Sequence, residues 1–341
     1  MPEVLAHGTI LGEGGPIETL PISLLTGFLG SGKTTLLRRA LAARGFADTA
    51  VVINELGEIG LDHYLVEAGE GPVVELPGGC LCCAIREDLA ATLRALIERR
   101  DCGAGPPFQR VIVETTGLAD PAPILFTLAA DPTLERRLRL DRVVATVDAT
   151  TAEPTLSRYA EAVRQVAVAD RVVVTKTDVR PWDEALRRAI AAHNPEAQPI
   201  LALGTEDLGG ILWGSAPDTA VSTRQAPTAL HTHGVHAHAV ALGKPCSRLE
   251  FARALGGLAR ERGDDLLRVK GILAFSDRPE RPAFVQGAQH ALYPPIWLEH
   301  WPDDDRRGRL QFIVHGIALS DILERFACAA AEPYRAAAPV S

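Results

Sequence analysis

The chain has few lysines, few aromatic residues and no long hydrophobic run. Only four of its 35 basic residues are lysine, and Phe, Trp and Tyr together make up 5% of the sequence. No stretch approaches the roughly 18 apolar residues that a membrane helix needs. The acidic Glu3 stands where a secretory signal would be basic. The sequence therefore predicts a cytoplasmic protein that does not cross a membrane.

Positive charge is also in short supply. The 43 Asp and Glu residues outnumber the 35 Lys and Arg residues, so the formal net charge is −8. Proteins that bind nucleic acid or anionic membranes usually carry a basic face, so we expect neither partner. The chain is 47% hydrophobic over 341 residues, which indicates about two globular domains at roughly 150 residues each.

Short, β-branched runs alternate with helical stretches from residue 20 to about residue 203. The predicted strands are residues 22–25, 50–53, 73–76, 110–113, 143–147, 171–175 and 199–203. The predicted helices are residues 34–44, 87–99, 123–130, 153–169 and 182–193. This alternation is typical of an α/β fold with a mostly parallel, doubly wound sheet. Ligands bind such sheets at the carboxyl ends of the strands.

The pattern changes in the second half of the chain. Residues 204–230 are rich in Gly, Ser, Thr and Pro and predict an irregular linker. A strand at 235–242, a helix at 247–262 with Ser247 as its N-cap, and further strands at 267–275, 283–289, 296–299 and 310–314 precede a last helix at 320–330. We expect an N-terminal extension (1–19), a P-loop domain (20–205), a linker (206–234), a smaller α+β domain (235–331) and a tail (332–341).

A phosphate-binding motif follows the first predicted strand and opens a helix. The sequence GFLGSGKT at residues 27–34 matches GxxxxGK[ST] in full. Backbone N–H groups of such a loop surround a phosphate at the positive end of the helix. Lys33 is then expected to reach the β- and γ-phosphates, and the Thr34 hydroxyl to bind Mg²⁺. The nucleotide contacts predicted here are Gly27, Gly30, Ser31, Gly32, Lys33, Thr34 and Thr35.

The sequence TKTD at residues 175–178 follows a late strand and has the form of a guanine-reading loop. The Asp178 carboxylate can accept hydrogen bonds from guanine N1–H and the 2-amino group, which adenine cannot offer together. The stem of Lys176 can cover the base. Thr175 stands where Asn is usual, so we expect one contact to the purine to be weaker and the selectivity for guanine to be relaxed.

Acidic residues end two further strands. Glu114, in ETTG at residues 114–117, is placed to bind Mg²⁺, and the Gly117 N–H to sense a γ-phosphate. The sequence NELGE at residues 54–58 occupies the place of a switch loop, and Glu55 is our candidate for positioning water or metal. The acids Glu58 and Asp62 are equally well explained as solvated loop residues.

Three cysteines lie within four positions, in GGCLCC at residues 78–83, just before a predicted helix. Cys80, Cys82 and Cys83 are too close for good disulfide geometry, and thiolates at a helix N-terminus are favoured ligands for soft metals. Three sulfurs leave one tetrahedral position open, which suits a metal that is held and then passed on. The alternatives are a buried reduced cluster and a redox switch.

Histidines are concentrated at the junction between the two predicted domains. Four lie in residues 231–238, where His236 and His238 share one face of the predicted strand. His236 and His238 are candidate metal ligands, and a non-binding segment explains them as well. His63, in the switch-like segment, is a weaker candidate for a fourth ligand beside the cysteines.

Taken together, these motifs resemble the CobW-type family of P-loop GTPases, the metal-chaperone relatives of the nickel-inserting HypB and UreG proteins. The likeness covers nearly the whole chain. It rests on GFLGSGKTT (27–35), NELGEIGLD (54–62), GGCLCC (78–83), ETTGLADP (114–121) and TKTD (175–178). Residues from about 235 to 330 resemble the accessory domain of that family.

The resemblance implies a GTP-hydrolysing metallochaperone that uses GTP, Mg²⁺ and Zn²⁺ and delivers metal, most often zinc, to a client metalloprotein. Co²⁺ is the alternative cargo, in relatives that serve cobalamin synthesis or nitrile hydratase activation. The residues themselves leave three other hypotheses open: a redox-regulated GTPase, a small-molecule kinase and a purely structural zinc site. The sequence does not separate a monomer from a homodimer.

Overall fold

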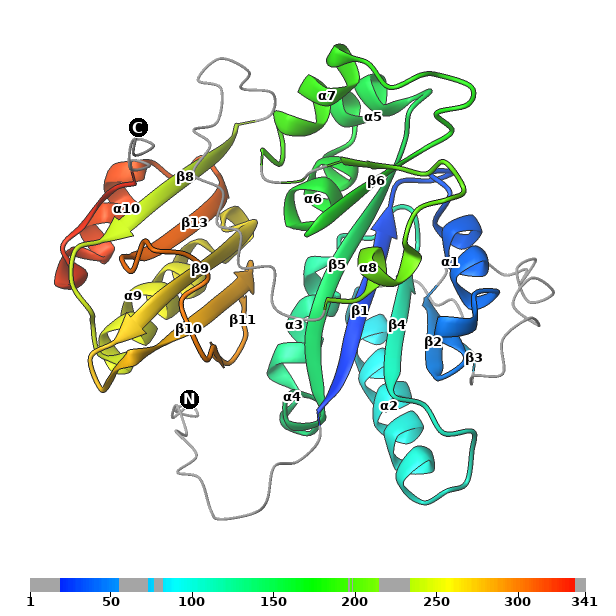
Figure 1. The fold of residues 1–341 in the computed structure, drawn as a ribbon, viewed down its shortest axis with the longest axis horizontal. Coiled ribbons are helices and arrows are strands. Elements are labelled where there is room, and N and C mark those ends of the chain that lie inside the picture. Colours follow the sequence, from blue (N-terminus) through cyan, green and yellow to red (C-terminus); the bar gives the residue numbers. More distant parts are fainter. Residues whose placement is uncertain are drawn as a thin grey trace.

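A computed structural model of the chain describes residues 19–54, 73–76, 82–195, 197, 199–214 and 234–334, with the backbone alone at positions 44, 54, 73–76 and 82–88. Two sheets form within these residues, each with its own helices (Figure 1). None of the described helices is long and apolar enough to span a membrane.

The first sheet is parallel throughout. Its strand order is β3-β2-β4-β1-β5-β6-β7, so β1 lies at the centre. The strands are β1 (Leu20–Gly27), β2 (Thr49–Asn54), β3 (Val73–Leu76), β4 (Arg110–Thr115), β5 (Leu138–Asp148), β6 (Arg171–Thr175) and β7 (Pro199–Leu201). The predicted doubly wound fold is confirmed, because helices cover both faces of this sheet.

Alternation along the strands sends neighbouring side chains to opposite faces. In β1, Ile22 and Leu24 pack on one face with α2 and α3, whereas Leu25 packs on the other with α1 and α8. The helices are α1 (Lys33–Leu41), α2 (Cys82–Asp101), α3 (Ala122–Ala130), α4 (Pro132–Arg137), α5 (Ala152–Arg158), α6 (Ala160–Val168), α7 (Glu184–Ala191) and α8 (Leu208–Leu212), with a short 3₁₀ helix η1 (Arg44–Phe46).

Two of the differences from the sequence prediction have a clear physical reason. The single helix expected over 153–169 is broken at Tyr159, whose backbone is extended and whose ring lies 4.6 Å from that of Phe28. The expected linker contains α8, and Ile211, Leu212 and Trp213 are buried in the core beneath α1. Burial of these apolar side chains outweighs the low helix propensity of the two glycines in α8.

The second sheet is antiparallel, in the order β11-β10-β9-β13-β8-β14, with β12 paired to β10. Its strands are β8 (Val235–Leu242), β9 (Arg268–Phe275), β10 (Arg278–Ala288), β11 (Ala291–Leu292), β12 (Ile296–Trp297), β13 (Gly308–His315) and β14 (Ala331–Pro333). Its helices are α9 (Arg248–Arg262) and α10 (Leu319–Arg325), with 3₁₀ turns η3 (Gly263–Asp265) and η4 (Ala327–Ala329). Ser247 caps α9 in a capping box with Glu250.

One face of the second sheet packs on α9 and α10, and the other contacts the first domain. Val235, Leu267 and Ile313 meet Val163 and Ala167 of α6. The hydroxyl of Tyr293 donates to the Leu125 carbonyl of α3 at 2.8 Å. The two domains therefore share a packed interface.

A buried ion cluster lies in that interface. Asp170, immediately before β6, is 7% exposed and is bonded by Arg268 and Lys270 of β9. It also accepts from the Val143 N–H at 2.7 Å. Burial raises the pKa of Asp170, but the two cations and these hydrogen bonds lower it more, so the net pKa lies below the ordinary carboxyl range. Asp170 is therefore ionised at neutral pH.

We expect Asp170→Ala to lower the free energy of unfolding by about 3–5 kcal/mol, because it removes the buried carboxylate that both Arg268 and Lys270 bond. Urea unfolding followed by circular dichroism measures this loss. The exposed Asp264→Ala is the control and is expected to change stability by less than about 0.5 kcal/mol. Equal effects of the two substitutions would contradict the structural role assigned to the cluster.

Candidate nucleotide-binding site

The P-loop, residues 27–34, connects β1 to α1. Gly27 has a φ of 143°, and a Cβ built on it would lie 2.4 Å from Thr146 Oγ1. Gly32, immediately before α1, has a φ of 90° and would meet Thr175 at 3.3 Å. Only glycine adopts such backbone angles readily and permits so close an approach. The loop is therefore packed tightly against the carboxyl ends of β5 and β6.

Lys33 is held against this loop. Its side chain is largely buried, and its ammonium donates to the carbonyl oxygens of Gly27 at 2.9 Å and Phe28 at 3.3 Å. Because α1 begins at Lys33, the cation and the positive end of the helix dipole lie together. The arrangement favours the binding of a phosphate group at this point.

Thr34 and Glu114 meet between the P-loop and the end of β4. The Thr34 hydroxyl donates to Glu114 Oε1 at 2.7 Å, and Glu114 is 4% exposed. A hydroxyl and a carboxylate are the hard oxygen ligands that Mg²⁺ prefers. These two residues therefore fit the magnesium site that the sequence predicts.

The residues of TKTD lie at the end of β6. The Thr175 hydroxyl donates to the Ser31 carbonyl at 2.8 Å and lies 3.3 Å from the Val147 carbonyl. This side chain thus ties the P-loop to β5 and β6. Lys176 has a left-handed backbone with a φ of 55°, and Asp178 is exposed.

Asp148, at the end of β5, belongs to the same site but was not predicted. It lies 2.6 Å from Lys176 Nζ and accepts from both the backbone N–H and the hydroxyl of Thr150. Burial raises the pKa of Asp148. Hydrogen bonds from Lys176 and Thr150, together with the charge of Lys176, lower this pKa by more, so the net pKa lies below the ordinary value. The sequence signal that could have identified Asp148 is its position at the carboxyl end of a predicted strand.

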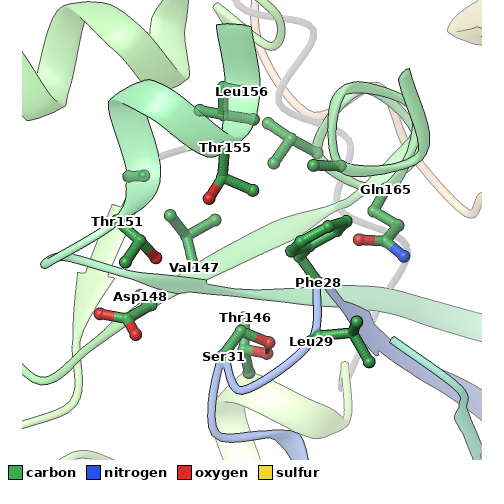
Figure 2. A pocket seen from close by; sticks show the side chains of 13 residues that line it. Phe28, Leu29, Ser31, Thr146, Val147, Asp148, Thr151, Thr155, Leu156 and Gln165 are labelled. Atoms are coloured by element: carbon green, nitrogen blue, oxygen red, sulfur yellow. Dashed lines mark hydrogen bonds between the residues drawn. The ribbon is translucent and has the colours of Figure 1, made fainter. Parts of the chain in front are cut away.

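A small pocket lies beside the P-loop, between β5 and the helices α5 and α6 (Figure 2). The hydroxyls of Ser31 and Thr146 lie 2.6 Å apart. Gln165 of α6 also lines the pocket and was not predicted. A glutamine within a helix carries no sequence signal of this kind, because most such side chains are solvated.

The structure brings together the predicted residues of the P-loop, Glu114, Gly117 and TKTD at one edge of the sheet. The segment 55–72, with Glu55, Glu58, Asp62 and His63, lies outside the described residues, as does Cys80. Cys82 and Cys83 occupy the first turn of α2, earlier than the helix start that we predicted, and their side chains are not described. These ligands stay predictions.

His236 and His238 are neighbours on β8, with parallel rings whose centroids lie 6.1 Å apart. His238 Nε2 is engaged with the Ile317 carbonyl at 3.0 Å, and burial lowers the pKa of His238. Among the described residues, no group of three or more His, Cys, Asp or Glu side chains is arranged to hold a metal. A metal at the histidine pair therefore stays a prediction.

The fold and the site define a P-loop nucleotide-binding protein with a second, antiparallel-sheet domain. Residues 21–200 match the family model for the CobW/HypB/UreG nucleotide-binding domain, and residues 235–330 match that for the cobalamin synthesis protein CobW C-terminal domain. The chain belongs to this family.

Two relatives and one solved structure are similar over most of the chain. It is 35% identical to the zinc chaperone YjiA of Escherichia coli, over 89% of this chain and 96% of that one. It is 30% identical to the zinc chaperone CobW of Pseudomonas aeruginosa, over 82% and 84% of the two chains. The crystal structure of the Zn(II)-bound YjiA GTPase from E. coli superimposes with a TM-score of 0.69 at 30% identity, covering 91% of this chain and 99% of that chain.

We expect Thr175→Val to weaken the binding of GDP and of a GTP analogue alike, by about fivefold, because it removes one hydrogen bond of roughly 1 kcal/mol between the P-loop and β6. Fluorescent-nucleotide titration measures both affinities. Thr177→Val changes a neighbouring hydroxyl in the same loop and is expected to leave them unchanged. A loss confined to one nucleotide would contradict a role in holding the loop.

Proposed function

We propose that this protein is a GTP-hydrolysing metallochaperone. It binds a transition metal, with zinc as the first candidate, at Cys80, Cys82 and Cys83, and delivers it to a client metalloprotein. Catalytic roles fall to Lys33, Thr34, Glu114 and Glu55. Support comes from the assembled P-loop site and from relatives that are named zinc chaperones.

The observation that carries this proposal is the order of the first three strands, β3-β2-β4. The cysteine motif follows the carboxyl end of β3, the segment NELGE begins at the end of β2, and Glu114 is the last residue but one of β4. The register pairs Asn54 with both Leu76 and Thr115. The three segments therefore leave neighbouring strands at the same edge of the sheet.

This arrangement supports a coupled switch. Metal bound by the cysteines favours one conformation of the segment 54–62 against bound GTP, and hydrolysis removes the γ-phosphate that holds that conformation. Release to the client follows from the lower metal affinity of the GDP state. By thermodynamic linkage, GTP must change metal affinity by the same factor as metal changes GTP affinity.

Thr34 and Glu114 would hold Mg²⁺, which supplies charge neutralisation at the phosphates when bound. Lys33 contributes a second positive charge from the P-loop. The Thr175 hydroxyl donates to the Ser31 carbonyl, whereas the Asp178 carboxylate is exposed at the edge of the site. Asp178 is therefore the residue of this loop that contacts the base and selects guanine.

The metal proposal is tested by anaerobic Zn²⁺ and Co²⁺ titrations with Mg²⁺ and either GDP or a non-hydrolysable GTP analogue. We expect thiolate-to-cobalt charge-transfer absorption, and a metal affinity that differs about tenfold or more between the nucleotides. The triple substitution Cys80/Cys82/Cys83→Ser should abolish the absorption, because the thiolates are the proposed ligands.

The exposed Cys102→Ser is the matched control and is expected to behave as the unmodified chain. Equal metal affinity in both nucleotide states would remove the coupled switch. Unfolding on metal removal would favour a structural zinc site. A reversible disulfide within the motif, without metal binding, would favour the redox-regulated GTPase.

The base preference is tested by competition with GDP and ADP. We expect GDP to bind more tightly, and Asp178→Ala to remove the preference, because only guanine donates from both N1 and the 2-amino group. Release of phosphate from GTP without an acceptor distinguishes hydrolysis from the kinase hypothesis. Equal binding of the two nucleotides by the unmodified chain would contradict the assignment of the TKTD loop.

A further inference from the structure

Helix α6 holds the loop that follows β4. Within this Gly117 loop, residues 116–121, the Gly117 and Ala119 carbonyls accept from Gln165 Nε2 at 3.2 and 2.9 Å. Asp120 accepts from Arg164 at 3.0 Å. Gln165 is 1% exposed, so its two bonds are shielded from water, whereas the Arg164 pair is partly solvated.

The opposite side of the Gly117 loop is fixed by the P-loop. A Cβ built on Gly117 would lie 2.7 Å from the backbone N and Cα of Leu29. Gly117 is therefore confined between the P-loop backbone and the Gln165 amide. Among the described residues, no acceptor is bonded to the Gly117 N–H. This donor is therefore not committed to an acceptor in the described part of the chain.

The Gln165 side chain has one further polar atom, Oε1. It is buried, and no described residue donates a hydrogen bond to it. The amide orientation follows from the two carbonyls that accept from the nitrogen. Figure 2 shows this side chain beside Phe28 and Leu29, at the edge of a cavity of about 20 Å³, which is room for one water molecule.

We propose that Gln165 is a positioning residue that fixes the Gly117 N–H for the γ-phosphate, and that it thereby sets the preference for GTP over GDP. The inference rests on the proposed GTPase function. GDP lacks the phosphate that would meet Gly117, so its binding depends on the P-loop and the TKTD loop. GTP binding depends in addition on where the Gly117 loop is held.

Asn194 provides a matched control for a purely structural role. It is fully buried, and its amide nitrogen donates to the Val166 and Ala169 carbonyls at 2.8 and 2.9 Å. It therefore makes the same kind of bonds as Gln165, at the carboxyl end of the same helix, but to no residue of the Gly117 loop. If Gln165 only stabilised α6, replacing either amide would have the same effect on the ratio of the affinities for the GTP analogue and GDP.

The experiment compares Gln165→Met, which keeps the side-chain length without the amide, with Asn194→Leu in the full-length chain. Affinities for GDP and for a non-hydrolysable GTP analogue are measured by fluorescent-nucleotide titration, and kcat and KM by phosphate release. We expect Gln165→Met to bind GDP within twofold of the unmodified chain. Its affinity for the GTP analogue and its kcat/KM should each fall about tenfold. Asn194→Leu should keep the ratio of the two affinities within twofold.

Thermal unfolding identifies a variant that fails to fold. In that case Gln165→Asn, which retains the amide but is one methylene too short to reach both carbonyls, replaces Gln165→Met with the same expectation. An unchanged ratio in a folded Gln165 variant, or an equal change in Asn194→Leu, would overturn the inference. Failure of the unmodified chain to bind or hydrolyse GTP would instead overturn the proposed function on which the inference rests.

Discussion

The parallel register of β1 with its two neighbours is the constraint on which the nucleotide site depends. Leu25 of β1 pairs with Glu114 of β4, and Gly27 pairs with Thr146 of β5. These pairings bring three connecting loops to one edge of the sheet. A shift of one residue would turn the Glu114 side chain to the other face and remove its bond to Thr34.

The same register makes a glycine necessary at position 27 of the P-loop. Because β5 continues to Asp148, the Thr146 backbone and hydroxyl lie against Gly27, and no side chain fits between them. Thr175 then bonds the Ser31 carbonyl from the next strand. The conformation of the P-loop is thus set by strands β5 and β6 as well as by its own sequence, which holds it in shape for a phosphate.

Much of the fold follows from local patterns. The strands Val73–Leu76, Arg171–Thr175 and Val235–Leu242 have the bounds that the sequence predicts, because short runs rich in Val and other apolar residues end at turn-forming or polar positions. The helix break at Tyr159 could not be predicted from local pattern, and the ring that this residue contacts, Phe28, is distant in the sequence. For the same reason, the burial of Trp213 was not foreseen from its glycine-rich surroundings.

Motif spacing located Lys33, Thr34, Glu114 and the TKTD loop, because phosphate and magnesium binding require fixed residue types at fixed intervals. Gln165 has no such interval. Its contact with the Gly117 loop crosses more than forty residues of sequence and exists only because α6 packs beside β1 and β5. The roles of Cys80, Cys82, Cys83 and Glu55 stay predictions from the sequence.

Helix α6 contacts the second domain as well as the Gly117 loop. While Gln165 bonds the Gly117 loop, Val163 and Ala167 pack against the second sheet. Helix α3, which follows the same loop, receives the Tyr293 hydroxyl from that domain. Both helices are therefore packed between the Gly117 loop and the second domain. Because packed interfaces adopt discrete arrangements rather than deform continuously, a displacement of this loop must be accommodated at surfaces that the two domains share.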